Sequence, residues 1–170
     1  YSALSCAGYL NFNETIKILR VRGDAMQNSV PKGEGGMLAV LGLEIKDLEK
    51  ILNDNKDNYN VQVANDNSNG QIVLSGKIKD LQILSEFFKN NKIKNIKLPV
   101  SAPFHCNLMS KATEVMTKKI QKINFEQSKN ILISNVTADE ISSIHDLKNL
   151  LISQIENKVR WRESILNMIN

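Results

Sequence analysis

The sequence is poor in several residue types that mark large classes of protein. Its 170 residues include only two cysteines and one tryptophan, and aromatic residues make up 5%. Cys6 and Cys106 lie far apart without a C-x-x-C motif, which indicates neither a disulfide framework nor a zinc site. We expect both thiols to be reduced, as in a cytoplasmic protein. The shortage of aromatic residues and the absence of a stacking motif argue against a nucleic-acid-binding surface.

Charge of one sign and long apolar runs are also scarce. The 22 Lys and Arg residues exceed the 18 Asp and Glu residues, and the net charge of +4 is spread along the chain. This excess allows a weak attraction to an acidic partner but predicts no nucleic-acid arm. No apolar run approaches the roughly 18 residues of a membrane-spanning helix, so no membrane partner is expected. A hydrophobic content of 42% in 170 residues is enough to bury a core.

Hydrophobic periodicity predicts a compact unit over residues 36–100. Strand, helix, strand, strand, helix and strand follow one another there. This βαββαβ order is typical of a ferredoxin-like sheet with two helices on one face. The expected strands are 36–43, 59–65, 71–76 and 96–100, and the expected helices are 44–55 and 78–91.

The segments on either side of this unit have no place in its sheet. Helical patterns cover residues 2–28 with a break around 9–15, residues 107–123, and residues 144–169 with a break near Asn157. Residues 130–136 have the pattern of a buried strand. We therefore expect 1–35 and 101–170 to form parts of a second domain. The first residues are already helical in character with nothing before them to cap a helix. We expect the chain to begin inside a longer protein.

Two residues stand out against apolar surroundings. Ile18, Arg22 and Met26 follow at four-residue intervals, so Arg22 lies on an apolar stripe of a helix. It could extend along the surface toward water or pair with a core acid. His105 follows Ala-Pro-Phe just before a helix, and its residue type alone leaves base, ligand and packed corner open. The other histidine, His145, lies among polar residues and is expected at the surface.

Six segments, taken in order, resemble one enzyme family. They are "YSAL", "VRGDAMQNSVPKGEGGMLAVLGL", "NDNSNGQIVLSG", "LPVSAPFHCNLM", "NVTA" and "QIENKVRWRESI". In this order and at about this spacing they are similar to the malonyl-CoA:acyl carrier protein transacylases, which load malonyl groups for fatty-acid synthesis. The resemblance covers essentially the whole chain. It departs at Asn69, where the family usually has Pro, and at Asn107, where Pro or Ala is common.

This resemblance implies an α/β fold and a mechanism. The fold is an α/β-hydrolase-like large domain, here 1–35 and 101–170, with a ferredoxin-like small domain inserted at 36–100. The reaction is ping-pong transfer of malonyl from malonyl-CoA to the phosphopantetheine thiol of acyl carrier protein, through a serine ester. The serine lies in a strand-turn-helix elbow of the form G-H-S-L-G-E. Since "YSAL" belongs to the helix after that elbow, the nucleophile is expected just before Tyr1, outside this chain.

Individual roles follow from the matched motifs. The resemblance implies that His105 is the base for the serine, and that the backbone carbonyl of Gln154 orients its imidazole. Arg22 would hold the malonyl carboxylate through a two-pronged, charge-assisted contact. The remaining substrate-binding residues implied are Met26 and Phe104 in the acyl pocket and Asn65 and Asn67 in the cleft, with Lys94 and Lys97 as candidates for docking the acidic carrier. The resemblance implies no cofactor and no metal, and a monomer is the working expectation.

Two other functions fit parts of the sequence. A ferredoxin-like regulatory or RNA-binding module would need a ligand pocket or stacking aromatic residues on its sheet. The predicted strands carry mainly aliphatic residues, and the flanking helices have no role in such a module. A non-catalytic acyltransferase-like domain is the second alternative. The presence of both Arg22 and His105 argues against such a loss of catalysis.

Overall fold

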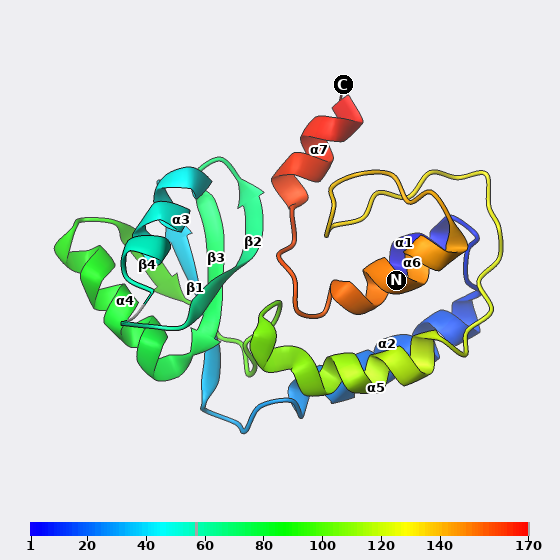
Figure 1. The fold of residues 1–170 in the computed structure, drawn as a ribbon, viewed down its shortest axis with the longest axis horizontal. Helices are drawn as coiled ribbons and strands as arrows, with labels where there is room; N and C mark the ends of the chain where they lie inside the picture. Colours follow the sequence, from blue (N-terminus) through cyan, green and yellow to red (C-terminus); the bar gives the residue numbers. More distant parts are fainter. Residues whose placement is uncertain (57, 170) are drawn as a thin grey trace.

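The structure, a computed structural model, describes residues 1–56 and 58–169 and has a mixed α/β fold. These residues form seven α-helices, one short 3₁₀ turn and one four-stranded sheet. Figure 1 shows the sheet with two covering helices at one end of the molecule, most of the other helices at the opposite end, and the C-terminal helix between them. Within the described ranges, no helix is both long enough and apolar enough to cross a membrane.

The antiparallel sheet has the strand order β2-β3-β1-β4. Its strands are β1 (Gly35–Leu41), β2 (Val61–Ser68), β3 (Gln71–Lys77) and β4 (Lys94–Lys97), with α3 (Ile45–Asp54) between β1 and β2 and α4 (Ile78–Asn90) between β3 and β4. The elements follow the order predicted from the sequence. The last strand, however, begins two residues before the predicted 96–100 and ends at Lys97. Pro99 has no N–H with which to continue the ladder against β1.

Each face of the sheet packs against a different part of the chain. Side chains alternate along a strand, so neighbouring residues of β1 point to opposite faces. One face packs with α3 and α4 in a core that includes Leu38, Val40, Leu48, Ile72, Leu74, Leu84 and Phe88. The other face, which we call the open face, carries a smaller cluster of Met37, Ala39, Ala64 and Val73. Leu98 and Phe104, from the segment after β4, pack on this open face.

The remaining helices surround a second core. They are α1 (Ser2–Cys6), α2 (Phe12–Gln27), α5 (Ser110–Ile120), α6 (Ile144–Ser153) and α7 (Trp161–Ile169), with the 3₁₀ turn η1 (Asn107–Met109) leading into α5. Figure 1 shows α2 and α5 side by side, and contacts between the two helices agree. The core joins residues far apart in sequence, among them Leu4, Ile18, Met26, Met116, Leu147 and Ile155. Side chains accept the first backbone N–H bonds at two helix starts, Asn11 before α2 and Ser143 before α6.

The predicted buried strand at 130–136 does not form, and this prediction is wrong. The segment has one isolated bridge, between Ile133 and Glu140, within the part of the chain that the structure describes. Leu132 and Ser134 are buried whereas Ile131 is 67% exposed, so the alternation that suggested a strand is present. A strand also needs a partner for its backbone N–H and C=O groups. Among the described residues, Glu140 pairs with this segment in a single bridge, and Asn135 O accepts from Arg160 N at 2.9 Å instead of from a neighbouring strand.

Arg162 at the start of α7 forms an ion pair that ties this helix to the sheet. Its Nε and Nη2 donate to the two carboxylate oxygens of Asp66 in β2, at 2.8–3.1 Å. Asp66 is 1% exposed, so its charge is buried together with this one cationic partner. The backbone continues the junction, because Val159 accepts from Asp66 N at 2.9 Å and donates to Ala64 O at 2.8 Å.

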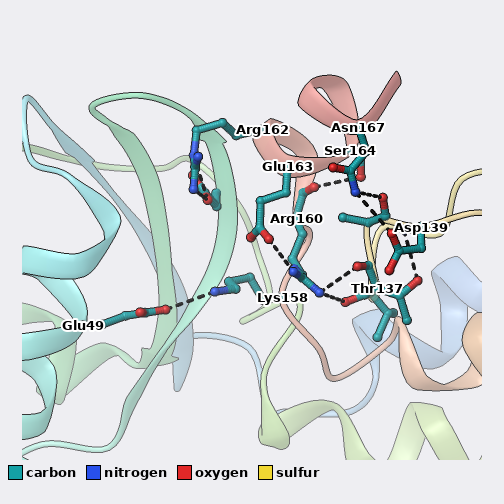
Figure 2. A network of polar contacts seen from close by, with 12 residues as sticks. Glu49, Thr137, Asp139, Lys158, Arg160, Arg162, Glu163, Ser164 and Asn167 are labelled. Carbon is teal, nitrogen blue, oxygen red and sulfur yellow. Dashed lines mark hydrogen bonds and ion pairs between the residues drawn. The ribbon is translucent and has the colours of Figure 1, made fainter. Parts of the chain in front are cut away.

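Neighbouring polar contacts extend the junction in two directions, as Figure 2 shows. Lys158 pairs with Glu49 of α3 at 3.0 Å. Arg160 pairs with Glu163 on one side and donates to the carbonyl of Thr137 at 2.8 Å on the other. The segment 158–163 therefore links the sheet end of the molecule to the loop that follows residue 130.

Replacing Asp66 should destabilise the protein. In Asp66→Ala the Arg162 guanidinium loses its partner at a largely buried position, and the free energy of unfolding should fall by about 3 kcal/mol. Asp24→Ala is the matched control, since the Arg20–Asp24 pair has 82% and 61% exposed side chains and should contribute no more than about 0.5 kcal/mol. Urea unfolding followed by circular dichroism measures both. Equal losses in the two variants would contradict the role given to the Asp66 pair.

Candidate active site

His105 lies in the loop between β4 and η1 with an uncommon backbone conformation. Its φ is 59°, in the left-handed region that residues with a Cβ rarely adopt. The half-buried imidazole places Nδ1 3.0 Å from the backbone oxygen of Gln154, the residue that caps the C-terminus of α6. A carbonyl oxygen only accepts, so the neutral ring carries its proton on Nδ1. Its Nε2 is then left with a lone pair that can take a proton.

The surroundings of His105 favour the neutral ring. Burial is the largest influence and lowers the pKa of His105 below its usual 6.5. The hydrogen bond from Nδ1 to Gln154 raises the pKa, and the positive charge of Arg22 lowers it further. The net direction is downward, so the ring is uncharged near neutral pH. A neutral imidazole with a free Nε2 is the form required of a general base.

Arg22 reaches the same residue that holds His105. Its Nη2 donates to the side-chain oxygen of Gln154 at 2.9 Å, and its guanidinium lies 5.9 Å from the centre of the Tyr1 ring. Gln154 thus contacts His105 through its backbone and Arg22 through its side chain. The first contact was expected from the sequence, and the second was not. Tyr1 was also missed, although it opens the matched segment "YSAL".

The positive charge of Arg22 has no carboxylate partner within residues 1–56 and 58–169. Its Nε is buried and lacks a hydrogen-bond partner among the described residues, as does the hydroxyl of Tyr1. Burial raises the pKa of Tyr1 to about 12, so this hydroxyl stays neutral. From the sequence, Arg22 could extend toward water or pair with a core acid. Within the described residues, the pairing with a core acid is wrong. A half-buried guanidinium with unused donors is suited to binding an anion.

A cavity of about 310 Å³ adjoins this group. Its wall includes Arg22 and Gln154 together with Tyr1, Leu19, Ser134 and Asn135. His105 is not among the residues of this wall, and it contacts the wall residue Gln154 through Nδ1. Arg22 and Gln154 therefore both face the cavity, and His105 is joined to them through Gln154.

The other predicted site residues make contacts of their own. Met26 is 2% exposed within the helical core, next to the turn of α2 that carries Arg22. Phe104 packs between that core and the open face of the sheet. Asn65 forms a backbone bridge to Val159, and Asn67 lines a different groove, beside Trp161 and Arg162. The structure brings together His105, Gln154 and Arg22. The substrate-binding roles of Met26, Phe104, Asn65 and Asn67 stay predictions.

The neighbour of His105 is not a competing nucleophile. Cys106 is buried, its thiol donates to the carbonyl of Pro103 at 3.1 Å, and Ser75 Oγ donates to its sulfur at 3.5 Å. Burial raises the pKa of the Cys106 thiol, which keeps it protonated and unreactive. The described residues contain no cluster of three side chains that could hold a metal ion. His145 is exposed, as predicted.

Several proteins of similar sequence and structure carry the name malonyl CoA-acyl carrier protein transacylase. The chain is 40% identical over 171 residues to the malonyl CoA-acyl carrier protein transacylase of Bacillus subtilis strain 168, and 32% identical over 166 residues to that of Salmonella typhimurium. The crystal structure of the Clostridium perfringens transacylase matches with a TM-score of 0.94 and 37% identity. The structure of a malonyl-transacylase in complex with a type II polyketide synthase acyl-carrier protein matches with a TM-score of 0.94 and 30% sequence identity. The chain is homologous to part of the malonyl CoA-acyl carrier protein transacylases.

This homology confirms the resemblance seen in the sequence. The Bacillus and Clostridium matches each cover 99% of this chain but 54% of the transacylase. The Salmonella match covers 97% of this chain and 54% of the transacylase. The transacylase in the complex with the carrier protein matches over 99% of this chain and 55% of its own length. The chain therefore spans about half the length of the transacylases that it matches. No protein-family model matches the chain.

The titration of His105 tests the electrostatics of His105 and Arg22. In the 170-residue chain the midpoint of His105, followed by NMR of its ring protons, should lie below 6.5. In Arg22→Gln it should move upward, because the positive charge that lowers it is gone. The lowered pKa also means that the contribution of His105 to the free energy of unfolding is fully present above about pH 6.5. Stability should then fall as pH drops through the folded pKa. A midpoint above 6.5, or one unmoved by Arg22→Gln, would contradict this account.

Proposed function

We propose that this chain carries the general base and the carboxylate-binding arginine of a malonyltransferase. The reaction is transfer of malonyl from malonyl-CoA to the phosphopantetheine thiol of acyl carrier protein, in fatty-acid biosynthesis. One observation carries the proposal: Gln154 contacts both His105 and an Arg22 whose charge has no carboxylate partner among the described residues. Homology to the transacylases over 97–99% of the chain supports it.

The proposed reaction has two half-reactions that share His105. The serine, which the resemblance places just before Tyr1, attacks the thioester carbonyl of malonyl-CoA while His105 Nε2 takes its proton. The carbon–sulfur bond breaks, and the coenzyme A sulfur leaves with that proton as the free thiol. In the second half, the carrier thiol gives its proton to Nε2 and attacks the serine ester. The ester bond breaks, the serine oxygen recovers the proton, and malonyl is carried away as a new thioester.

Arg22 would select the acyl group by its free carboxylate. The malonyl carboxylate can accept from the guanidinium donors that the chain leaves unused, with Tyr1 stacked beside them. A bound carboxylate would also offset the positive charge that lowers the His105 pKa. The base therefore becomes stronger when a malonyl group is in place. An acetyl group has no carboxylate and gains neither effect.

We extend the proposal to the domains. Residues 1–35 and 101–170 would belong to an α/β-hydrolase-like large domain, and 36–100 would be an inserted ferredoxin-like domain. Two separate cores support this division, one drawn from residues 4–26 and 102–155 and the other from 38–88. The strand order β2-β3-β1-β4, with α3 and α4 on one face, also supports it.

Partners and location follow from the same proposal. Lys94 and Lys97 are exposed on β4 and remain candidates for docking the acidic carrier protein. Malonyl-CoA would serve as substrate, with no further cofactor. We place the activity in the cytoplasm, where thiols stay reduced. The free thiols of Cys6 and Cys106 are consistent with that location.

Ester formation tests the proposed chemistry directly. A longer protein that contains this chain and its upstream serine should gain one malonyl group on that serine when mixed with malonyl-CoA, as read by intact-mass analysis. His105→Ala in that protein should slow the step by about a hundredfold to ten-thousandfold, the range of a general base. The 170-residue chain alone should gain no malonyl group. A stable malonyl adduct on any residue of this chain would refute the proposed division of labour.

Arg22 should decide between acyl donors. In the longer protein, Arg22→Ala should lower malonyl transfer at least tenfold to a hundredfold, since charge-assisted hydrogen bonds are worth about 1.5–3 kcal/mol each. Acetyl transfer should be spared or raised. Arg20→Ala, an exposed arginine on the same helix, is the matched control and should change neither rate. Equal losses for the two donors would show that Arg22 is structural.

A further inference from the structure

The open face of the sheet carries two polar side chains in an otherwise apolar cluster. Cross-strand pairing places Met37 opposite Ser75 and Ser75 opposite Gln62, so these three form one row across β1, β3 and β2. Ser75 is fully buried and Gln62 is half-buried. A buried polar group on an apolar face normally has a partner that explains it. Here both partners lie in the loop that carries His105.

The two side chains hold the two residues that directly follow His105. Gln62 Oε1 accepts from the backbone N–H of Asn107 at 2.7 Å. Ser75 Oγ donates to the sulfur of Cys106 at 3.5 Å. The first contact exists because residue 107 has an N–H, which a proline at this position would lack.

The residues before His105 also rest against the sheet. A Cβ at Gly35 of β1 would lie 2.4 Å from Cγ of Pro103, so only glycine allows this close approach. Phe104 packs on the open face beside Met37 and Val73. The loop is therefore held on both sides of His105 by strands of one sheet.

His105 needs such support because its backbone is strained. A left-handed φ of 59° in a residue with a Cβ persists only where the surroundings impose it. The same conformation places the imidazole Nδ1 against Gln154, which belongs to the helical part of the molecule. Without contacts on both sides, the loop would relax and the imidazole would lose its orientation.

We propose that Gln62 and Ser75 are positioning residues for the base, and that the sheet of residues 35–97 holds His105 in place through them. This inference rests on the proposed function, in which His105 Nε2 takes the proton of the serine. It assigns the sheet a part in the chemistry. Gln62 would act through Asn107, from whose backbone N–H it accepts, and not by contact with the imidazole.

Three variants separate this role from general stability. Gln62→Met keeps the size of the side chain but cannot accept from Asn107 N–H. Gln62→Glu keeps an acceptor oxygen and should restore the contact. Gln71→Met, an exposed position in the same sheet, is the matched control. Long-range proton–nitrogen NMR of the 170-residue chain reports which ring nitrogen of His105 carries the proton, and steady-state kinetics of the longer protein reports kcat and KM.

Wild type, Gln62→Glu and Gln71→Met should show a single His105 tautomer protonated on Nδ1, whereas Gln62→Met should show a mixture. In the longer protein, Gln62→Met should lower kcat about tenfold to a hundredfold with KM for malonyl-CoA unchanged. A single Nδ1 tautomer in Gln62→Met, or Gln62→Glu as impaired as Gln62→Met, overturns the inference. Absence of the serine ester in wild type would instead overturn the proposed function, and the tautomer measurement would still decide the positioning role.

Discussion

The candidate site depends on the two contacts made by Gln154. Its backbone oxygen fixes the tautomer of His105, and its side-chain oxygen holds one donor of Arg22. The backbone contact is independent of residue type, whereas the side-chain contact requires an acceptor of this length. Gln154 lies at the C-terminus of α6, where the helix dipole places partial negative charge. That charge favours a protonated imidazole, which a base becomes during the reaction.

Burial sets the state of both His105 and Arg22. Burial and the nearby guanidinium hold His105 neutral, and the same burial leaves Arg22 with unused donors. The strained backbone of His105 and the half-buried charge of Arg22, which has no carboxylate partner among the described residues, are each unfavourable by themselves. They occur within one region where Phe104 packs against both the helical core and the open-face cluster. Several locally unfavourable features in one region are characteristic of functional sites rather than of packing alone.

Local patterns predicted much of this fold, and non-local partners explain what they missed. The helices α3 and α4 and the strand β3 follow from periodicity and turn residues, which act within a few positions. Residues 130–136 have a strand pattern, yet a strand depends on a partner elsewhere in the chain. Arg22 and His105 were recognisable from an apolar stripe and a matched motif. The side-chain contact of Gln154 and the support from Gln62 were not, because 132 and 45 positions separate the partners.

The junction at Asp66 and Arg162 also bears on the edges of the sheet. A sheet has two edge strands, and an open edge can pair with a strand of another chain. Along the edge strand β4, Lys94 and Lys97 are exposed, and their charge opposes such pairing. On the opposite edge, Val159 already occupies backbone groups of Ala64 and Asp66. The ion pair keeps that covering segment in place, so one buried carboxylate both joins two parts of the fold and closes a route to aggregation.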